Sequence, residues 1–229
     1  MNSNWEQKYN NINVIYEDNH ILVAEKPANI PVCEDNSHDL DFLTMLKNYI
    51  KNKYNKTGNV YLGLVHRLDR PVGGVMVFAK TSKASSRLAK QIQDHKMDKV
   101  YYAVVNGKID KEGEMIDYLY KDRINNMSYV TDKNKGKEAI LKYRRLGYNK
   151  DYNYSLVEVF LYTGRSHQIR VQFASRGFPL VGDQKYGKIR DNKTNIALFS
   201  HKLSFNHPTT KERLEFNLDI PKRYPFDLF

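Results

Sequence analysis

The spacing of apolar and polar residues predicts that the chain begins with a strand hairpin followed by a helix. The segment Ile12–Val32 holds two apolar, β-prone runs on either side of Asp18-Asn19, a pair typical of tight turns. In Asp39–Lys53 the apolar residues recur at helical spacing, and Asp39 or Asp41 can accept hydrogen bonds at the helix start. We therefore expect a hairpin that runs through a loop into an amphipathic helix.

The polar sequence HRLDRP interrupts the next apolar stretch. It lies within Tyr61–Lys80, between two strand-like runs, and is predicted to form the turn that joins them. Ser82 can cap a second helix, in which Ala84, Leu88 and Ile92 make one face. The strand-like KVYYAVVNG follows that helix.

The second half of the chain is dominated by β-prone runs, which are ILKYRRLGY, YSLVEVFLY, ALFSHKLSF and RLEFNL. One helix is expected among them, starting around Ser166 and ending at Gly177, because glycine accepts the left-handed conformation at a helix end. Strands outnumber helices and cluster instead of alternating with them. This pattern favours an α+β fold with a mixed sheet.

The charge of the chain points to a polyanionic partner. Its 229 residues fit one large domain or two closely packed halves. The 37 Lys and Arg against 26 Asp and Glu give a net charge of +11, and nucleic acid is the default partner of such a surface. A basic surface without a special ligand is the alternative that charge alone leaves open.

Cysteine use and hydropathy indicate a cytoplasmic protein. Cys33 is the single cysteine of the sequence, so neither an intrachain disulfide nor a thiolate-rich metal site is expected. The polar amino terminus lacks the apolar core of a signal peptide, and no apolar run approaches the roughly 18 residues of a membrane span. We expect a reducing cytoplasm and no association with membranes.

A cluster of cations surrounds one carboxylate in HRLDR, residues 66–70. Asp69 would stay ionised beside His66, Arg67 and Arg70, and an ionised carboxylate can act as a nucleophile or base. The arginines suit phosphate groups and planar bases. The same residues also fit a structural role, in which Asp69 accepts hydrogen bonds from turn amides and pairs with an arginine.

A second cluster, TGRSHQIR at 163–170, lies where a strand hands over to a helix start, a place that attracts anions. Arg165 would lie near that start, whereas Arg170 could reach a neighbouring carboxylate. The alternative is a solvated helix face on which His167 and Gln168 are capping or polar surface groups. The spacing of the histidines matches no recognised metal site.

Tyr101 and Tyr102 stand side by side in a predicted strand, so one ring should point inward and the other outward. One of them could stack on a nucleic-acid base. Taken without further context, a core or half-buried aromatic on a sheet is the favoured interpretation of the pair.

Taken together, four blocks resemble the RluA-type family of pseudouridine synthases, which modify ribosomal and transfer RNA. They are YEDNHILVAEKPANIPV, HRLDRPVGGVMVFAKT, KVYYAVVNG and TGRSHQIRVQFASRGFPLVGDQKYG, and they follow the family's order. The resemblance implies the pseudouridine synthase fold, with a mixed, largely antiparallel central sheet, a few flanking helices and an active-site cleft between two halves. It also implies a single catalytic domain over residues 1–229, because no room for the S4 domain of many relatives exists ahead of Ile12.

Carried over by position, the resemblance makes Asp69 the catalytic aspartate, Tyr101 the active-site tyrosine and Arg170 the arginine that pairs with the aspartate. Arg67 fills the space that a flipped uridine leaves, and Ile169 packs near the base. We also assign His66, Arg165 and His167 to substrate binding. One departure is visible, because Val72-Gly73 stands where the family has Thr-Ser, and this could loosen the catalytic turn.

The reaction that the resemblance implies needs RNA and neither a metal nor an organic cofactor, and no obligatory protein partner is evident. A non-catalytic RNA-binding or ribosome-assembly protein on the same fold is the alternative. It would have no need for a carboxylate that repels phosphate. A metal-dependent nuclease would want clustered acidic ligands, which the sequence does not offer.

Overall fold

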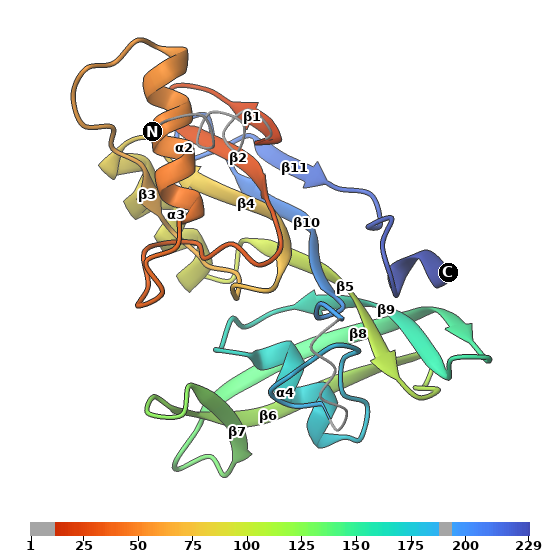
Figure 1. The fold of residues 1–229 in the computed structure, drawn as a ribbon. Coiled ribbons are helices and arrows are strands. Elements are labelled where there is room, and N and C mark those ends of the chain that lie inside the picture. The colour runs from red at the N-terminus through yellow and green to blue at the C-terminus, as the bar shows by residue number, and fades with distance from the viewer. Residues whose placement is uncertain (1–11, 188–193) are drawn as a thin grey trace. The chain divides into compact units, whose positions relative to one another are not determined.

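The chain divides into two structural units. The computed structural model describes residues 12–187 and 194–229, so the polar amino terminus lies outside it. Unit 1 contains the residues up to Met97 together with Leu203–Asn217, and unit 2 contains Asp98–Lys202 together with Leu218–Phe229. Each unit is drawn with its own strands and helices in Figure 1.

Unit 1 is built on antiparallel strands that begin with the predicted hairpin. Its strands are β1 (Val14–Glu17), β2 (Ile21–Lys26), β3 (Gly63–Leu64), β4 (Gly73–Ala79) and β11 (Arg213–Asn217), with the end of β10 (Leu198–Asn206). β1 pairs with β2, and both β2 and β3 pair with β4. The Asp18 carboxylate accepts from the N–H groups of His20 and Ile21 at 2.7 and 2.8 Å, which fixes the hairpin turn.

Two helices pack on unit 1, α2 (Phe42–Lys53) and α3 (Ser82–Gln93). Asp41 caps α2, one of the two residues predicted to do so, by accepting from the N–H of Thr44. The predicted cap of α3 is wrong by one residue: Thr81 has the extended backbone of an N-cap and accepts from the N–H of Ala84, so Ser82 is the first helical residue.

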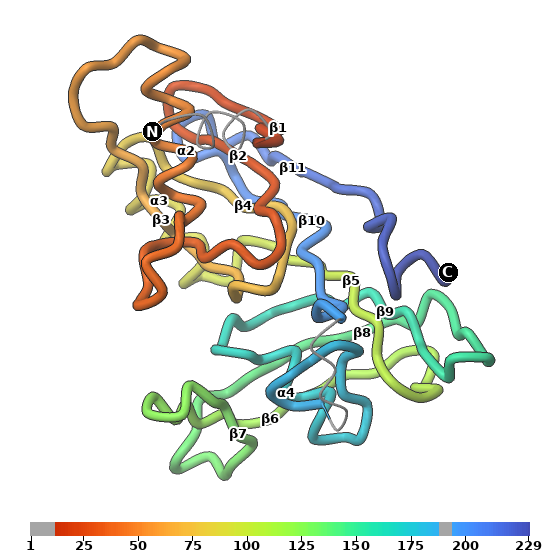
Figure 2. Tube along the Cα trace, viewed as in Figure 1, coloured from red at the N-terminus to blue at the C-terminus, as the bar shows by residue number. Residues whose placement is uncertain are grey.

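A late segment of the chain completes unit 1. The ring of Phe216 lies 5.6 Å from that of Tyr16 and 5.8 Å from that of Phe205, and His207 lies 2.8 Å from the Asp18 carboxylate. In Figure 2 the blue trace of β11 accordingly lies near the red trace of β1, and that of β10 lies beside β4. Residues almost two hundred positions apart in the sequence therefore share one core.

Unit 2 is an antiparallel sheet with one helix on it. Its strands are β5 (Asp98–Asn106), β6 (Glu112–Asp122), β7 (Met127–Thr131), β8 (Lys137–Asn149) and β9 (Tyr154–Leu161), in the order β5-β9-β8-β6-β7. Helix α4 (Gln168–Ser175) contacts β6 and β7, and a 3-10 turn, η1 (Phe226–Leu228), lies near the carboxyl end.

The α+β class is confirmed, with largely antiparallel strands and helices packed on them. The pair β6–β7 was not predicted, and α4 starts two residues later than expected, because His167 takes a left-handed backbone with φ of 55°. Gly177, with φ of 84°, follows the end of α4 as predicted. In the described part of the chain, no helix has the length and apolarity needed to span a membrane.

Candidate active site

The HRLDR residues form a tight turn between β3 and β4 in unit 1. The carbonyl of Asp69 accepts from the N–H of Val72 at 2.9 Å, which closes the turn. Leu68 points into the core, Asp69 is half-buried and Arg67 is exposed. A buried leucine between two polar residues fixes which side chains of the turn face solvent. Arg67 and Asp69 are thus presented on a rigid frame.

His66 anchors this turn to the neighbouring strand. Its Nε2 accepts a hydrogen bond of 3.1 Å from the N–H of Val77 in β4. A ring nitrogen that accepts carries no proton, so this bond requires the neutral imidazole in its Nδ1–H tautomer. The predicted substrate-binding role of His66 is not tested by this contact, but a positioning role is evident.

Lys26, the last residue of β2, clamps the turn from inside unit 1. Its side chain is 0% exposed, and its ammonium donates to the carbonyls of Pro27, Arg70 and Val72 at 2.8, 3.1 and 2.8 Å. Burial lowers the pKa of Lys26 to about 7, the negative charge of Asp69 opposes this shift, and the positive charge of Arg70 adds to it. A buried cation thus holds the backbone around Asp69 and stabilises its negative charge.

The Val72-Gly73 departure fits this clamp. The carbonyl of Val72 is one of the three acceptors of Lys26, and Val72 itself is buried. A Cβ at Gly73 would lie 3.1 Å from the Lys26 carbonyl oxygen and 3.2 Å from the Ala28 nitrogen. Glycine therefore lets the strand that follows the turn approach the backbone of Lys26 and Ala28 closely.

Arg70 faces a loop that precedes α2. Its guanidinium pairs with Asp39, lies 3.7 Å from the Asp35 carboxylate, and donates to the Ser37 hydroxyl at 2.9 Å. Hydrogen bonds to Ser37 and the charge of Arg70 lower the pKa of Asp35, and the bond and charge of Arg70 also lower the pKa of Asp39. Of the cations predicted around Asp69, Arg70 thus ties down a neighbouring loop.

In unit 2, Gln168 organises the approach to α4. Its side chain is buried, which corrects the interpretation of Gln168 as a surface group. Its carbonyl oxygen accepts from the Thr163 hydroxyl at 2.8 Å and from the Arg165 N–H at 3.0 Å, while its amide donates to the Ile140 carbonyl. The 163–168 segment is therefore fixed against β8 before the helix begins.

Arg170 makes a buried, bidentate ion pair with Asp183. Its Nε and Nη2 donate to the two carboxylate oxygens at 2.9 and 2.7 Å. Burial would raise the pKa of Asp183, but the hydrogen bonds and charge of Arg170 and the N–H groups of Lys185 and Tyr186 outweigh it and lower that pKa. The two bonds and the burial of both side chains fix the orientation of the Arg170 guanidinium.

Tyr186 joins Arg170 to His167. Its ring lies 5.3 Å from the Arg170 guanidinium carbon, and its hydroxyl accepts from the Ser128 N–H at 2.7 Å and lies 2.8 Å from His167 Nδ1. Burial raises the pKa of Tyr186, so the phenol keeps the proton it can give to His167. Two of the predicted site residues, His167 and Arg170, therefore share one neighbour.

The remaining predicted residues of unit 2 lie on β5 and around α4. Tyr101 is buried on β5, opposite Val159 of β9, whereas Tyr102 turns to the other face and stacks on His201 at 4.0 Å between ring centroids. Ile169 is buried, and Arg165 is exposed with its Nε donating to the Glu138 carbonyl at 2.8 Å. The two rings leave opposite faces of β5 as predicted, but Tyr102 is half-buried against a second core cluster and does not point outward into solvent.

The predicted site residues thus form two groups, one in each unit. Unit 1 holds His66, Arg67 and Asp69 in one turn, and unit 2 holds the others around α4 and on β5. The predicted pairing of Arg170 with Asp69 links the two groups and stays a prediction. Lys26 and Asp183 were not predicted, although a lysine that ends the apolar strand ILVAEK just before proline was a signal for the first.

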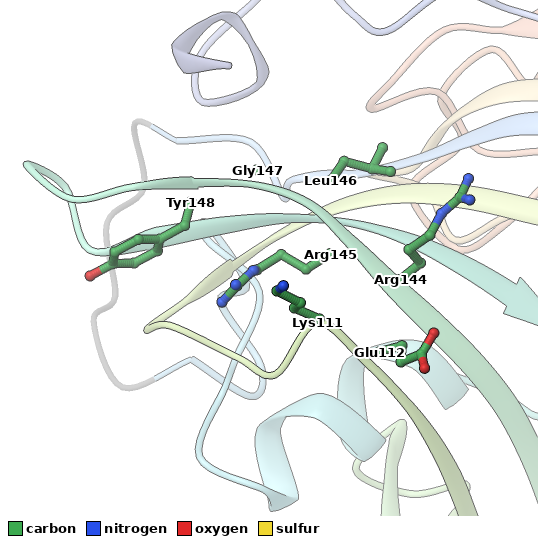
Figure 3. Close-up of a pocket in the computed structure, with 7 residues that line it drawn as sticks. All are labelled: Lys111, Glu112, Arg144, Arg145, Leu146, Gly147 and Tyr148. Carbon is green, nitrogen blue, oxygen red and sulfur yellow. The ribbon is translucent and has the colours of Figure 1, made fainter.

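A surface cavity of unit 2 is lined by other residues. It measures about 540 Å³ and is bounded by Lys111, Glu112 and the β8 segment Arg144–Tyr148 (Figure 3). The register between β8 and β9 shifts between Arg145 and Gly147, so Leu146 is an extra residue that re-aims the side chains of the bulge. Within residues 12–187 and 194–229, no cluster of three or more His, Cys, Asp or Glu side chains is placed to hold a metal.

Comparison with solved structures supports the fold. Human RNA Pseudouridylate Synthase Domain Containing 4 matches with a TM-score of 0.78 at 19% identity, over 94% of this chain and 91% of that one. Human RNA Pseudouridylate Synthase Domain Containing 1 matches with a TM-score of 0.77 at 20% identity, over 96% and 88%. The fold implied by the sequence motifs is therefore confirmed.

Sequence relatives carry the match further. A protein of Aquifex aeolicus named as an uncharacterized RNA pseudouridine synthase is 35% identical, over 93% of this chain and 71% of that protein. Ribosomal large subunit pseudouridine synthase D of Zymomonas mobilis is 33% identical over 92% and 70%, and tRNA pseudouridine synthase C of Vibrio parahaemolyticus is 30% identical over 91% and 90%. The family model described as RNA pseudouridylate synthase matches residues 20–175, which include the Asp69 turn, β5 and α4. On this ground the chain belongs to the RNA pseudouridylate synthase family.

Proposed function

We propose that this synthase isomerises specific uridines of ribosomal or transfer RNA and that Asp69 is the carboxylate on which the reaction depends. The observation that carries the proposal is the turn of Asp69, which is closed on itself and clamped by buried Lys26 within the segment that matches the family. The relatives named above include one named for ribosomal RNA and one for transfer RNA, which supports this substrate class.

The chemistry asks for one carboxylate. The N1–C1′ glycosidic bond of uridine breaks, the detached uracil turns, and a C5–C1′ bond forms, after which the hydrogen at C5 leaves as a proton and N1 gains one. No water or electron is consumed. Asp69 can add to the nucleotide or act on its ribose while the base departs, in contrast with the carboxylate pair of typical glycosidases. One ionised carboxylate on a rigid turn supplies either route.

The other predicted site residues bind the RNA, contact the base or position Asp69. Exposed Arg67 fills the space left when uridine flips out of the folded RNA, which offsets part of the lost stacking. Tyr101 stacks on the base and assists proton movement at C5. Arg170, oriented by Asp183, pairs with Asp69 and holds it in place. His66 and His167 position the turn and Tyr186, and Ile169 packs near the base.

We assign RNA binding to the basic surface of the chain. The net charge of +11 supplies the attraction, and the cavity beside the Leu146 bulge offers cations together with Tyr148, whose ring lies 5.4 Å from the Lys108 ammonium. We place the reaction in the cytoplasm, in keeping with the ribosomal and transfer RNA for which the relatives are named. The alternative, a non-catalytic RNA-binding protein, shares this surface but leaves the clamped carboxylate without a purpose.

The test is tritium release from unmodified ribosomal and transfer RNA labelled at uracil C5, because forming the C1′–C5 bond must expel that hydrogen. Wild type and Asp69→Ala are compared in the presence of chelator. We expect release by wild type alone, with RNA affinity of the variant within about an order of magnitude, since phosphate contacts dominate affinity. Release by Asp69→Ala at the wild-type rate would remove Asp69 from the reaction. Binding without release by wild type would support the non-catalytic alternative.

A further inference from the structure

Lys99 places a second positive charge on the strand that carries Tyr101. The two residues lie two positions apart on β5, so their side chains leave the same face of the strand. Lys99 is half-buried, and across the described part of the chain no hydrogen bond or ion pair to its ammonium is found. A lysine that is withdrawn from solvent without an acidic partner is costly.

The positive charge of Arg165 makes this cost larger. Burial lowers the pKa of Lys99, and the positive charge of Arg165 lowers it further. Arg165 cannot swing away freely, because its Nε is bound to the Glu138 carbonyl and its N–H to Gln168. Gly164, which precedes Arg165, has no side chain, and a Cβ there would lie 3.3 Å from the Lys99 Nζ. The fold thus places the cations of Lys99 and Arg165 beside the backbone of a glycine.

We propose that Lys99 and Arg165 form a subsite for a backbone phosphate of the RNA next to the flipped uridine. An anion between the two cations removes their repulsion and supplies the partner that Lys99 lacks. The absent side chain at Gly164 lets the phosphate approach the main chain. Tyr101 on the same strand face places this phosphate beside the nucleotide that reacts. The inference rests on the proposed function, because it takes the ligand to be substrate RNA.

The subsite is tested by the salt dependence of RNA binding in the Asp69→Ala background, where no reaction interferes. The probe is a pool of unmodified transfer and ribosomal RNA transcripts. Lys99→Met should weaken binding and reduce the slope of log K against log salt by about 0.7 to 0.9, the value for one phosphate contact. Lys90→Met is the control with the same charge change, since the Lys90 ammonium already pairs with Asp94 at 2.7 Å. An unchanged slope in Lys99→Met would overturn the subsite.

Two further variants separate phosphate binding from folding. Lys99→Arg keeps a cation and should restore the slope, and Gly164→Ala keeps both cations but crowds Nζ and should weaken binding. If Lys99→Met fails to fold, Arg165→Met gives the same slope measurement at an exposed site. In the active protein, Lys99→Met should raise KM more than it lowers kcat; the reverse would mark Lys99 as acting on the chemistry. Absence of tritium release from wild type would refute the proposed function while the binding slopes still decide on the subsite.

Discussion

The ammonium of Lys26 has three N–H groups and meets three carbonyls, whereas the neutral amine has two. Because its pKa is about 7, Lys26 loses its proton as the pH rises through neutrality. We expect kcat/KM of wild type to fall between roughly pH 6 and 8.5, with the pH dependence of a single deprotonation. The neutral amine makes one hydrogen bond fewer to the turn, and Asp69 loses a neighbouring positive charge. Lys26→Met should be slow at every pH and lack this step. A wild-type kcat/KM that does not change over this pH range would show that the Lys26 ammonium does not contribute to catalysis.

Asp183 should matter most for stability. Breaking a buried pair leaves an uncompensated charge, so Asp183→Asn should lower the free energy of unfolding by about 3–5 kcal/mol, measured by urea unfolding at neutral pH. The folded-state pKa of Asp183 is lowered. Its contribution is therefore complete above the unfolded value of about 3.9 and is lost as the pH falls through the folded value. The difference between wild type and Asp183→Asn should shrink in acid, and a constant difference would contradict this.

The sequence predicts the residues of the catalytic motifs better than the residues that contact them in the fold. His66, Arg67 and Asp69 are neighbours in the chain, so their shared turn was predicted from local pattern alone. The clamp was not, because the carbonyls that Lys26 binds on Arg70 and Val72 lie 44 and 46 residues away. Asp183 is 13 residues from Arg170 and beyond the helix that carries it. Residues that meet only through tertiary contacts have no regular separation in the sequence, so a sequence pattern does not reveal them.

At the scale of elements, the cap of α3 offers a matched pair of variants. Thr81→Ala removes the acceptor of the Ala84 N–H and should lower the free energy of unfolding by about 1 kcal/mol. Ser82→Ala, one residue on, should change it by no more than a few tenths, because Ser82 is a helical residue with no cap bond. Thermal or urea unfolding of both variants makes the comparison. An equal decrease in the free energy of unfolding in both variants would show that Ser82 contributes to the cap.

Strand β6 shows why the pair β6–β7 was not predicted. In β6 the buried residues are Met115 and Leu119, four positions apart, while the alternate positions between them stay partly exposed. Four is a helical spacing, so the period of two that marks a strand is hidden. Leu119 packs with Ala139 and Val171, and only this later contact shows which face of β6 is inward. The strands outside this pair were found from their apolar, β-prone runs.

For the whole molecule, the excess of positive charge predicts RNA affinity that falls steeply with salt. The cavity beside the Leu146 bulge should carry part of this effect. Lys111→Ala should reduce the salt slope by about 0.7 to 0.9, whereas Lys135→Ala, whose ammonium already lies 3.9 Å from the Asp132 carboxylate, should leave it nearly unchanged. Filter binding of labelled transcripts gives both slopes. Equal slopes in the two variants would remove the cavity from the RNA-binding surface.

The route of the chain through its two units has a consequence for the order of its synthesis. Unit 1 leaves its first segment at Met97 and regains the end of β10 and all of β11 only with Leu203–Asn217. A chain emerging from the ribosome therefore exposes the apolar edge of the first unit while the whole of Asp98–Lys202 is translated. At about 5–20 residues per second this wait lasts several seconds or more. The second unit has most of its strands before the first can close, so the later-synthesised part of this protein is positioned to fold first.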